Sequence, residues 1–487
     1  MKIIHLILLL IFFIDAFSQH TTFIVRSDSS LWGYSSFETT NGNFISIGSV
    51  NDKNINNRQN GGLLVEFNNS SILNINNFYK QDTSLYFYRG FQKENGNYFI
   101  YGLLSDSIWE QTYYKHLYLC EIAPDFQVVW EKTYPVPEGY TLHLGNFVID
   151  NSNCLVIFSS LRIVPYSNEH LYLNKFDQEG NLIATTFEPD YAASPYNDII
   201  LKPDGSGYFI IGGLTINNIS KNTFEIDTSL NIVNAGGCLG GDNWLSYPCS
   251  AKYLPDGGLF IVNNESQETP GAYIDLEVRV TDDQFNTISD TVIIDPDNVY
   301  TPVNEGVDYV YDDLIWTCTF SYYPTSWQGT EIFKVYLFDK EMNMKGMKVF
   351  GGDSRWWLID VTATTDGGCI FTGIIREEGG TTSFDNDLYI LKVMPEDVIT
   401  NIPDFETAYC EKIETFPNPV KDKFHVKGVS SKMKLTIASL EGKRLLTKDL
   451  IADTENIINT SSLNSGIYFF KIVDGNQTLK SGKLIKH

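Results

Sequence analysis

Long apolar runs and helical periodicity are both scarce in this chain, and each deficit limits its architecture. Beyond residue 18, no apolar stretch of the 487-residue sequence approaches the ~20 residues that a membrane-spanning helix needs. Apolar residues rarely recur at every third or fourth position, which is the spacing of an amphipathic helix. The sequence therefore predicts no transmembrane segment and little helix.

Positive charge is scarce over most of the chain. Of its 35 Lys and Arg and 60 Asp and Glu, the segment 411–487 holds 13 and 8, a net of +5. The remaining 22 basic and 52 acidic residues give the body a net of −30. A surface this acidic repels phosphate backbones, so no nucleic-acid partner is expected. We interpret the charge as a solvated surface; calcium binding is the rarer alternative, and no other cofactor is indicated.

Motifs that carry catalytic or metal chemistry are missing. The sequence contains no Cys-x-x-Cys, no His-Glu-x-x-His and no phosphate-binding glycine loop. It also lacks the Gly-x-Ser-x-Gly of serine hydrolases and the Asp-x-Asp-x-Asp-Gly of calcium loops. A glycosidase needs two neighbouring carboxylates, but the many acidic residues of the body offer many chance pairs. The sequence therefore nominates no catalytic residue and no metal ligand.

The seven cysteines do not follow a disulfide scaffold. Those that lie inside apolar, strand-like runs are expected to be buried free thiols: Cys120, Cys154, Cys318 and Cys369. Cys238 and Cys249 flank a loop and form the most plausible disulfide pair.

Residues 1–18 have the pattern of a secretory signal peptide. Lys2 supplies a positive start, Leu6–Ile14 is an uninterrupted apolar run, and Ala16 and Ser18 precede the expected cleavage site. No cysteine follows the apolar run, so a lipid anchor is not indicated. The sequence predicts a protein that is exported.

Aromatic residues are abundant at 14% and favour strands. A turn followed by a short apolar strand recurs along the chain at a step of about 54 residues. The anchors of these repeats are Gly42, Gly96, Ser152, Ser206, Gly257, Asp312 and Gly367. A second landmark keeps the same step: HLYLCEIAPDFQVVW begins at His116 and HLYLNKFDQEGNLIA begins at His170.

Each repeat holds about four strands, and its second hairpin turns at Asp- and Asn-rich segments. We interpret the Asp residues there as turn formers: Asp125, Asp177, Asp227, Asp283 and Asp339. A four-stranded sheet cannot bury both faces alone, so radial stacking into a seven-bladed β-propeller over residues 19–394 is expected. The segment that begins at Thr21 has no hairpin partner and is expected to complete the last blade. A β-solenoid is the alternative, but the step is too long for one coil.

The repeat is absent from residues 395–415, which we interpret as a linker. Residues 416–487 alternate apolar and polar positions between turns, which predicts a small immunoglobulin-like β-sandwich. The repeats resemble tandem-repeat propellers that are common in secreted proteins of the Bacteroidetes. That resemblance implies no activity.

The C-terminal segment resembles the type A sorting domain of the type IX secretion system. The residues that carry this resemblance are Pro417, Asn418, Pro419, Gly442, Gly466, Tyr468, Lys483 and Lys486. The resemblance implies a Gram-negative bacterium, passage through the periplasm, and the type IX machinery with its signal peptidase as partners. It also implies secretion or display at the outer-membrane surface, often with attachment to lipopolysaccharide.

Loops that lead into the innermost strand of each repeat are the expected ligand-binding region. They contain aromatic rings beside carboxylates, which suits sugars. Among the residues of these loops, those predicted to bind the ligand are Trp244, Asp353, Trp356, Trp357 and His143. The same loops also contain Asp82, Tyr86, Tyr196, Asn197, Asp308 and Tyr309. Packing between blades is the simpler explanation for any one of these rings.

Three functions remain open at this point. The favoured one is a non-catalytic binding protein for a glycan or a protein. The second is an extracellular carbohydrate-active hydrolase or lyase, which acids converging in the channel with perturbed ionisation would favour. The third is a structural adhesion module.

Overall fold

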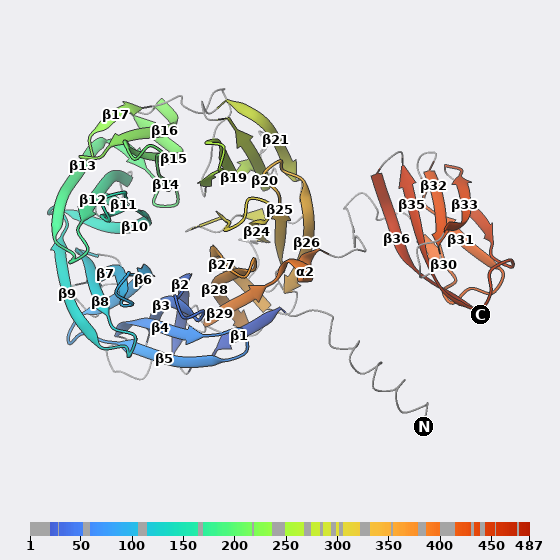
Figure 1. Ribbon diagram of the computed structural model, residues 1–487, viewed down its shortest axis with the longest axis horizontal. Helices are drawn as coiled ribbons and strands as arrows, with labels where there is room; N and C mark the ends of the chain where they lie inside the picture. The colour runs from blue at the N-terminus through green and yellow to red at the C-terminus, as the bar shows by residue number, and fades with distance from the viewer. Residues whose placement is uncertain are drawn as a thin grey trace. The chain divides into compact units, whose positions relative to one another are not determined.

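Strands dominate the chain (Figure 1). The computed structural model describes residues 20–27, 29–51, 59–105, 114–163, 169–216, 219–235, 249–266, 274–282, 286–293, 299–300, 305–321, 332–351, 354–377, 386–399, 414–429, 433–438, 444–452, 454–474 and 477–487. Across these ranges α2 (Pro395–Val398) is the only α-helix, and no helix is long and apolar enough to cross a membrane. The chain divides into two compact units, 1–399 and 400–487. The prediction of an all-β chain is confirmed.

In the first unit, antiparallel sheets are arranged around a common centre, which is a propeller-like architecture (Figure 1). The first sheet contains β2 (Ser30–Glu38), β3 (Phe44–Asn51), β4 (Asn60–Phe67) and β5 (Ile72–Phe78). The second contains β6 (Ser84–Gln92), β7 (Tyr98–Ser105), β8 (His116–Ile122) and β9 (Val128–Pro135). In both, the first strand in sequence is the innermost and the last is the outermost.

The next sheet has eight strands because two consecutive four-strand meanders join through β13 and β15. The first meander is β10 (Tyr140–Ile149), β11 (Leu155–Ile163), β12 (Glu169–Phe176) and β13 (Leu182–Ala193). The second is β14 (Asp198–Leu201), β15 (Gly207–Ile216), β16 (Ile219–Asp227) and β17 (Ile232–Ala235).

Three further sheets complete the ring. One contains β18 (Cys249–Tyr253), β19 (Leu259–Ser266), β20 (Ile274–Thr281) and β21 (Thr287–Ile293). The next contains β22 (Val299–Tyr300), β23 (Val307–Asp308), β24 (Ile315–Ser321), β25 (Ile332–Phe338) and β26 (Met344–Gly351). The last contains β27 (Ser354–Ala363), β28 (Cys369–Glu377), β29 (Asp387–Val393) and β1 (Thr21–Val25).

Turn chemistry explains the hairpins. In the turn after β12, Asp177 Oδ1 accepts the backbone N–H groups of Glu179 and Asn181 at 3.0 and 2.7 Å. Asp125, Asp227 and Asp339 accept backbone N–H groups in the equivalent turns, so their prediction as turn formers is confirmed. In the turn after β20 this acceptor is Asp282, and the predicted Asp283 lies outside the described residues. Gly96 adopts a φ of 88° in an inner turn, a conformation that favours glycine.

The core lies between neighbouring sheets. The second strand of a sheet, such as β3, is buried along its length, whereas outermost strands such as β5 are largely exposed. Cys120, Cys154, Cys318 and Cys369 are buried free thiols, as predicted. Cys249 is also a buried free thiol, and Cys238, its expected disulfide partner, lies outside the described residues.

The two ends of the first unit meet in one sheet. β1 pairs with β29 in antiparallel register, from Thr21 opposite Lys392 to Val25 opposite Leu388. This confirms that the segment from Thr21 completes the last sheet. Val25 is buried in a cluster that joins residues of the first sheet to Ile390 of the last. The fold of the first unit therefore depends on pairing between the first and the last strand of its sequence.

The second unit has two facing sheets around one core. One contains β30 (Glu414–Phe416), β31 (Lys423–Lys427) and β34 (Asn456–Asn459). The other contains β32 (Met433–Ala438), β33 (Arg444–Leu450), β35 (Gly466–Asp474) and β36 (Gln477–Lys486). Phe424, Leu435 and Ile472 are fully buried between them.

A substitution on β1 tests the closing strand. We expect Val25→Asp to lower the unfolding free energy of the first unit by roughly 3 kcal/mol, because it buries an unpaired carboxylate. Thr22→Asp on the exposed face of the same strand is the control and should change it by less than about 0.5 kcal/mol. Equal denaturation midpoints for the two variants would contradict the role given to β1.

Candidate functional site

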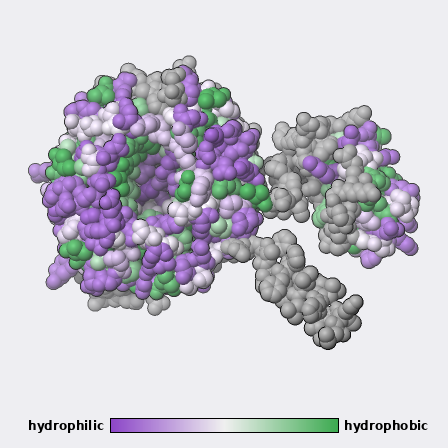
Figure 2. Space-filling view, in the orientation of Figure 1, coloured by the Kyte–Doolittle hydropathy of each residue, from purple (hydrophilic) through white to green (hydrophobic). Residues whose placement is uncertain are grey.

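The innermost strands surround the centre of the first unit (Figure 1). Figure 2 shows a hollow at this centre, with hydrophilic residues deep inside it. An innermost strand is flanked by its own sheet and by two neighbouring sheets. Its accessible side chains therefore open onto this hollow, which we call the channel.

Strand register identifies equivalent positions on the inner strands. Each of β2, β6, β10 and β27 has a bulge, located at Gly33/Ser35, Phe87/Arg89, Leu144/Phe147 and Leu358/Asp360. In each of these four strands, the residue that immediately precedes the bulge occupies the equivalent position in its sheet. These residues are Trp32, Tyr86, His143 and Trp357. Trp32, Tyr86 and Trp357 carry large aromatic rings. All four side chains are at least partly exposed.

An aromatic layer, defined as Trp32, Tyr34, Tyr86, Tyr88 and Trp357, spans three sheets at this level. Trp357 of the last sheet meets Trp32 of the first edge to face, with ring centroids 5.9 Å apart. Tyr34 of the first sheet meets Tyr88 of the second at 5.3 Å. Burial raises the pKa of the Tyr34, Tyr86 and Tyr88 phenols above the ordinary value. These hydroxyl groups therefore stay neutral and can donate hydrogen bonds.

The predicted ligand-binding residues have different fates. Trp357 is 38% exposed and belongs to the aromatic layer. His143 occupies the equivalent position on β10, where its Nδ1 lies 2.8 Å from the Glu169 carboxylate. Trp356 does not line the channel. It is buried, and its ring centroid lies 4.4 Å from that of Tyr389 and 5.5 Å from that of Phe333. Adjacent residues of a strand face opposite ways, so only one of this Trp pair can reach the channel. Trp244 and Asp353 lie outside the described residues.

Below the aromatic layer, one polar residue from each successive inner segment forms a ring that we call the polar girdle. Its members are Ser35, Arg89, Asn146, Asp198, Ser250, Glu305 and Asp360. Each of these side chains is buried. They link each inner strand to the next.

The first half of the girdle runs from β2 to β14. Ser35 Oγ donates to the Tyr88 carbonyl at 3.1 Å. Arg89 donates to Asn146 Oδ1, and Asn146 Nδ2 donates to Asp198 Oδ1. Each bond crosses from one inner strand to the next, so the side chains join neighbouring meanders where their backbones do not pair.

The second half continues to β18 and beyond. Asp198 Oδ2 accepts the Ala251 N–H at 3.0 Å and the Ser250 hydroxyl at 3.3 Å. Ser250 Oγ then accepts the Gly306 N–H at 3.0 Å. The adjacent Glu305 carbonyl accepts the N–H of Val361 on β27, also at 3.0 Å.

Asp360 connects the last inner strand of the girdle back to the first. Its Oδ2 accepts the Ser36 N–H of β2 at 3.2 Å and the Thr362 hydroxyl at 2.9 Å. Next to it, Asp308 Oδ2 accepts the Ala363 N–H at 2.8 Å. The hydrogen bonds therefore return to the strand on which they began.

Two cations, Arg89 and Lys252, pair with carboxylates of the girdle. The Arg89 guanidinium contacts Glu305 at 2.5 Å and Asp360 at 3.1 Å. Lys252 Nζ contacts Glu305 and lies 3.5 Å from Asp308. Burial alone would lower the pKa of Lys252, but the charges of Glu305 and Asp308 outweigh it and raise the pKa. Both cations therefore remain charged at neutral pH.

The pKa values of the girdle carboxylates are shifted in opposite directions. Burial raises the pKa of Asp198 to about 6 and that of Asp360 to about 7, with the Glu305 charge acting in the same direction. Burial would also raise the pKa of Glu305, but Lys252 and Arg89 outweigh it and lower the pKa. Each carboxylate oxygen of these three residues already meets an N–H, a hydroxyl, an ammonium or the guanidinium.

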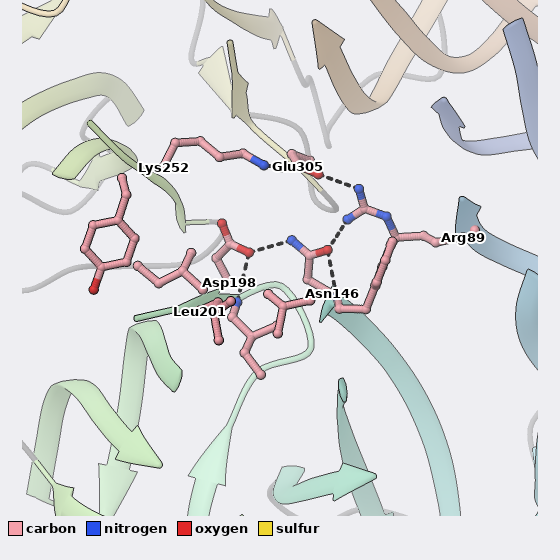
Figure 3. Close-up of a pocket in the computed structure, with 12 residues that line it drawn as sticks. Arg89, Asn146, Asp198, Leu201, Lys252 and Glu305 are labelled. Atoms are coloured by element: carbon pink, nitrogen blue, oxygen red, sulfur yellow. Dashed lines mark hydrogen bonds and ion pairs between the residues drawn. The ribbon is translucent and has the colours of Figure 1, made fainter. Parts of the chain in front are cut away.

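A cavity of about 310 Å³ lies against the girdle (Figure 3). Its polar wall contains Arg89, Asn146, Asp198, Lys252 and Glu305. The rest of its lining is largely apolar: Phe147, Val148, Ile199, Ile200, Leu201 and Tyr253. Among the residues that the structure describes, no group of three or more His, Cys, Asp and Glu could hold a metal ion.

Sequence reasoning missed the girdle, although a signal exists. Most members lie at the same distance before their repeat anchor: Ser35, Arg89, Ser250, Glu305 and Asp360. Asn146 and Asp198 are displaced from that position by a single residue each. Alignment of the repeats would have shown a polar column, but the chemical types differ too much to reveal contacts. Of the additional loop residues, Asp308 does reach the network through Lys252.

The sorting-motif residues cluster at the end of the second unit. Asn418 Oδ1 accepts the Ile485 N–H at 2.9 Å, which links the Pro417–Pro419 turn to the last strand. The Tyr468 hydroxyl donates to the Asn464 carbonyl at 2.8 Å, and Lys486 is buried. Lys483 pairs with Phe469 in the β35–β36 ladder, with Gly466 at its end. Gly442 lies outside the described residues.

Comparison with known proteins identifies the second unit. Residues 414–487 match the family "Secretion system C-terminal sorting domain". This domain indicates a type IX secreted or cell-surface protein. No curated protein sequence matches the chain.

The chain is also similar to solved structures, at TM-scores of 0.38 to 0.41. A protein of unknown function from Dyadobacter fermentans aligns with a TM-score of 0.41 at 8% identity, covering 76% of this chain and 98% of that one. The GH93 α-L-arabinofuranosidase of Fusarium graminearum aligns with 0.39 at 10%, covering 79% and 100%. The β-propeller domain of the Pyrococcus furiosus trilobed protease aligns with 0.38 at 10%, covering 79% and 98%.

The girdle predicts how stability depends on pH. The folded-state pKa values of Asp198 and Asp360 lie above the ordinary 3.8, so the folded state holds these protons more tightly than the unfolded state. The unfolding free energy should therefore rise as pH falls from 8 to about 5.5, by on the order of 1 kcal/mol or more. Below about pH 4.5 the trend should reverse, because carboxylates with lowered pKa values such as Glu121 (about 2) lose their stabilisation.

Urea unfolding of the full chain at several pH values measures this slope. In the double variant Asp198→Asn/Asp360→Asn the slope between pH 5.5 and pH 8 should flatten to about half or less, whatever the variant's absolute stability. An unchanged slope in that variant would contradict the assignment.

Proposed function

We propose that this chain is exported through the type IX secretion system and that its propeller acts as a non-catalytic glycan-binding protein outside the cell. The observation that carries the proposal is the aromatic layer, in which Trp32, Tyr86 and Trp357 occupy equivalent places on inner strands. A flat ring covers the apolar C–H face of a sugar, while neighbouring hydroxyl and acidic groups bind its hydroxyls. Trp357 is exposed enough to do so at 38%.

We also infer that the body has seven blades. The eight-stranded sheet counts as two blades, since it contains two consecutive four-strand meanders. The repeat step of about 54 residues supports the same count. β22 is then an extra strand at the edge of the blade that contains β23–β26.

The route we propose follows from the ends of the chain. Residues 1–18 direct the chain to the periplasm of a Gram-negative bacterium of the Bacteroidetes, and residues 416–487 direct it across the outer membrane. The signal peptidase of the system would then cleave within the predicted linker 395–415, after Ile399, where the first unit ends, and lipopolysaccharide would anchor the body or the body would be released. The net charge of −30 on the part of the chain before position 411 suits a protein that stays soluble outside the cell.

A hydrolase or lyase is the second candidate, because Asp198 and Glu305 share a cavity and have pKa values displaced in opposite directions. We rank it lower for a geometric reason. Each oxygen of these carboxylates is already engaged, mostly with backbone N–H groups and cations that hold neighbouring sheets together. The ranking would be reversed if the chain released reducing ends or an unsaturated product from any polysaccharide and the variant Glu305→Gln lost that activity.

The binding role predicts a specific effect of the aromatic layer. On an array of plant, algal and host polysaccharides, Trp357→Ala and Trp32→Ala should each weaken binding of the recognised glycan by about tenfold, equivalent to about 1.4 kcal/mol. Tyr311→Ala removes a ring that is 46% exposed in a turn after β23, and it should bind as the wild type does. Absence of binding across the whole array, or equal loss in the control, would contradict the proposal.

The export role predicts a separate effect. A chain that ends at Ile399 keeps the β1–β29 closure and should accumulate in the periplasm instead of reaching the medium or cell surface. Residues 400–487 fused to a folded periplasmic reporter should carry that reporter out. Immunoblots of periplasm, surface and medium measure both, and surface delivery of the truncated chain would contradict this role.

A further inference from the structure

The cavity beside the polar girdle lies beyond the aromatic layer along the inner strands. On β10 the order is His143 at the level of the aromatic layer, then Asn146 in the girdle, then Phe147 and Val148 in the cavity wall. The cavity is therefore a separate place from the predicted ligand-binding loops, on the side of the inner turns. Its volume of about 310 Å³ is at the lower end of the range for ligand sites.

The size of the cavity matches one small unit. At ~30 Å³ for each water in the liquid, the cavity holds about ten waters, which corresponds to a molecule of about a dozen non-hydrogen atoms. A single pentose or hexose ring has this size. A disaccharide or a peptide would extend out of the cavity.

The lining is amphipathic in the way that a sugar ring is. Phe147, Val148 and Leu201 are half-buried and offer apolar surface. On the opposite side, Lys252 Nζ has three donors and meets two carboxylates, and its side chain is 31% exposed. Asn146 Nδ2 has two donors and gives one of them to Asp198. Donor capacity thus remains on the polar wall, facing apolar contacts.

The charges of the wall favour an uncharged occupant. Lys252 and Arg89 both touch Glu305, and Arg89 also touches Asp360. An anionic ligand would compete with Glu305 for Lys252, and a cationic ligand would approach Arg89 and Lys252 themselves. Breaking a buried pair costs more than a new surface contact returns. Neutral hydroxyls can accept from Lys252 and Asn146 without disturbing these pairs.

We propose that this cavity is a binding subsite for one neutral monosaccharide unit, either free or at the end of a chain. The inference deepens the proposed glycan-binding function and rests on it. Phe147 and Leu201 contact the apolar face of the sugar, and Lys252 and Asn146 donate to its hydroxyls.

Titration calorimetry on the full chain tests the subsite with a panel of free sugars: glucose, galactose, mannose, arabinose, rhamnose, glucuronic acid and glucosamine. We expect at least one neutral sugar to bind, and at least tenfold more tightly than either charged sugar. Leu201→Trp fills the cavity from β14 and should abolish this binding. Val148→Phe fills it from β10 with a smaller change, should weaken binding at least tenfold, and serves if Leu201→Trp fails to fold.

Two matched variants separate this inference from the proposed function. Ile183→Trp adds the same ring on the exposed face of β13 and should bind the monosaccharide as the wild type does. Trp357→Ala should also keep monosaccharide binding while weakening polysaccharide binding about tenfold. If polysaccharide binds through Trp357 but no neutral monosaccharide binds, the subsite is wrong and the proposed function stands. Monosaccharide binding that survives both cavity-filling variants, or that favours a charged sugar, also overturns the subsite.

Discussion

The structure of the body depends on the buried guanidinium of Arg89. It comes from the second sheet, yet it contacts Asn146 of the next meander and also Glu305 and Asp360, which lie far along the chain. A ring of separate sheets has no backbone pairing across most of its inner boundaries, so side chains must join them. Arg89 is suited to this task because its planar group offers five donors and keeps its charge when buried. The remaining girdle bonds extend the same principle around the channel.

This arrangement has a cost that links it to function. Removing charges from water is unfavourable, and the raised pKa values of Asp198 and Asp360 express that cost. The network holds its polar groups in fixed places beside a cavity and below a layer of aromatic rings. A rigid polar wall facing apolar surface is what a small polar ligand requires, since little ordering is left for the binding step. On the proposed function, the same contacts that close the ring also hold the channel ready for a ligand.

The repeating parts of the fold were predictable, and the contacts between repeats were not. The regular repeat step, the turn-forming Asp177 and Asp227, and the closure by the segment at Thr21 all follow from local patterns that recur. The girdle differs, because Arg89, Ser250 and Glu305 share a position in their repeats but not a chemical type. Their function comes from neighbours in other repeats, which a single repeat does not contain. The burial of Trp356 beside the exposed Trp357 has a related reason: adjacent residues of a strand face opposite ways, and the sequence alone does not say which of the two faces the channel.

We propose that the channel is where this exported propeller binds its glycan. Hydroxyl-radical footprinting of the full chain, with and without the polysaccharide it binds, tests this most directly, because oxidation of a Trp ring reports its exposure. If the channel binds the glycan, bound glycan should protect Trp357 and Trp32, which belong to the aromatic layer, and leave Trp130 on the outermost strand β9 unchanged. Protection of Trp130 with no protection of Trp357 and Trp32 would rule out the channel and place the ligand on the outer surface.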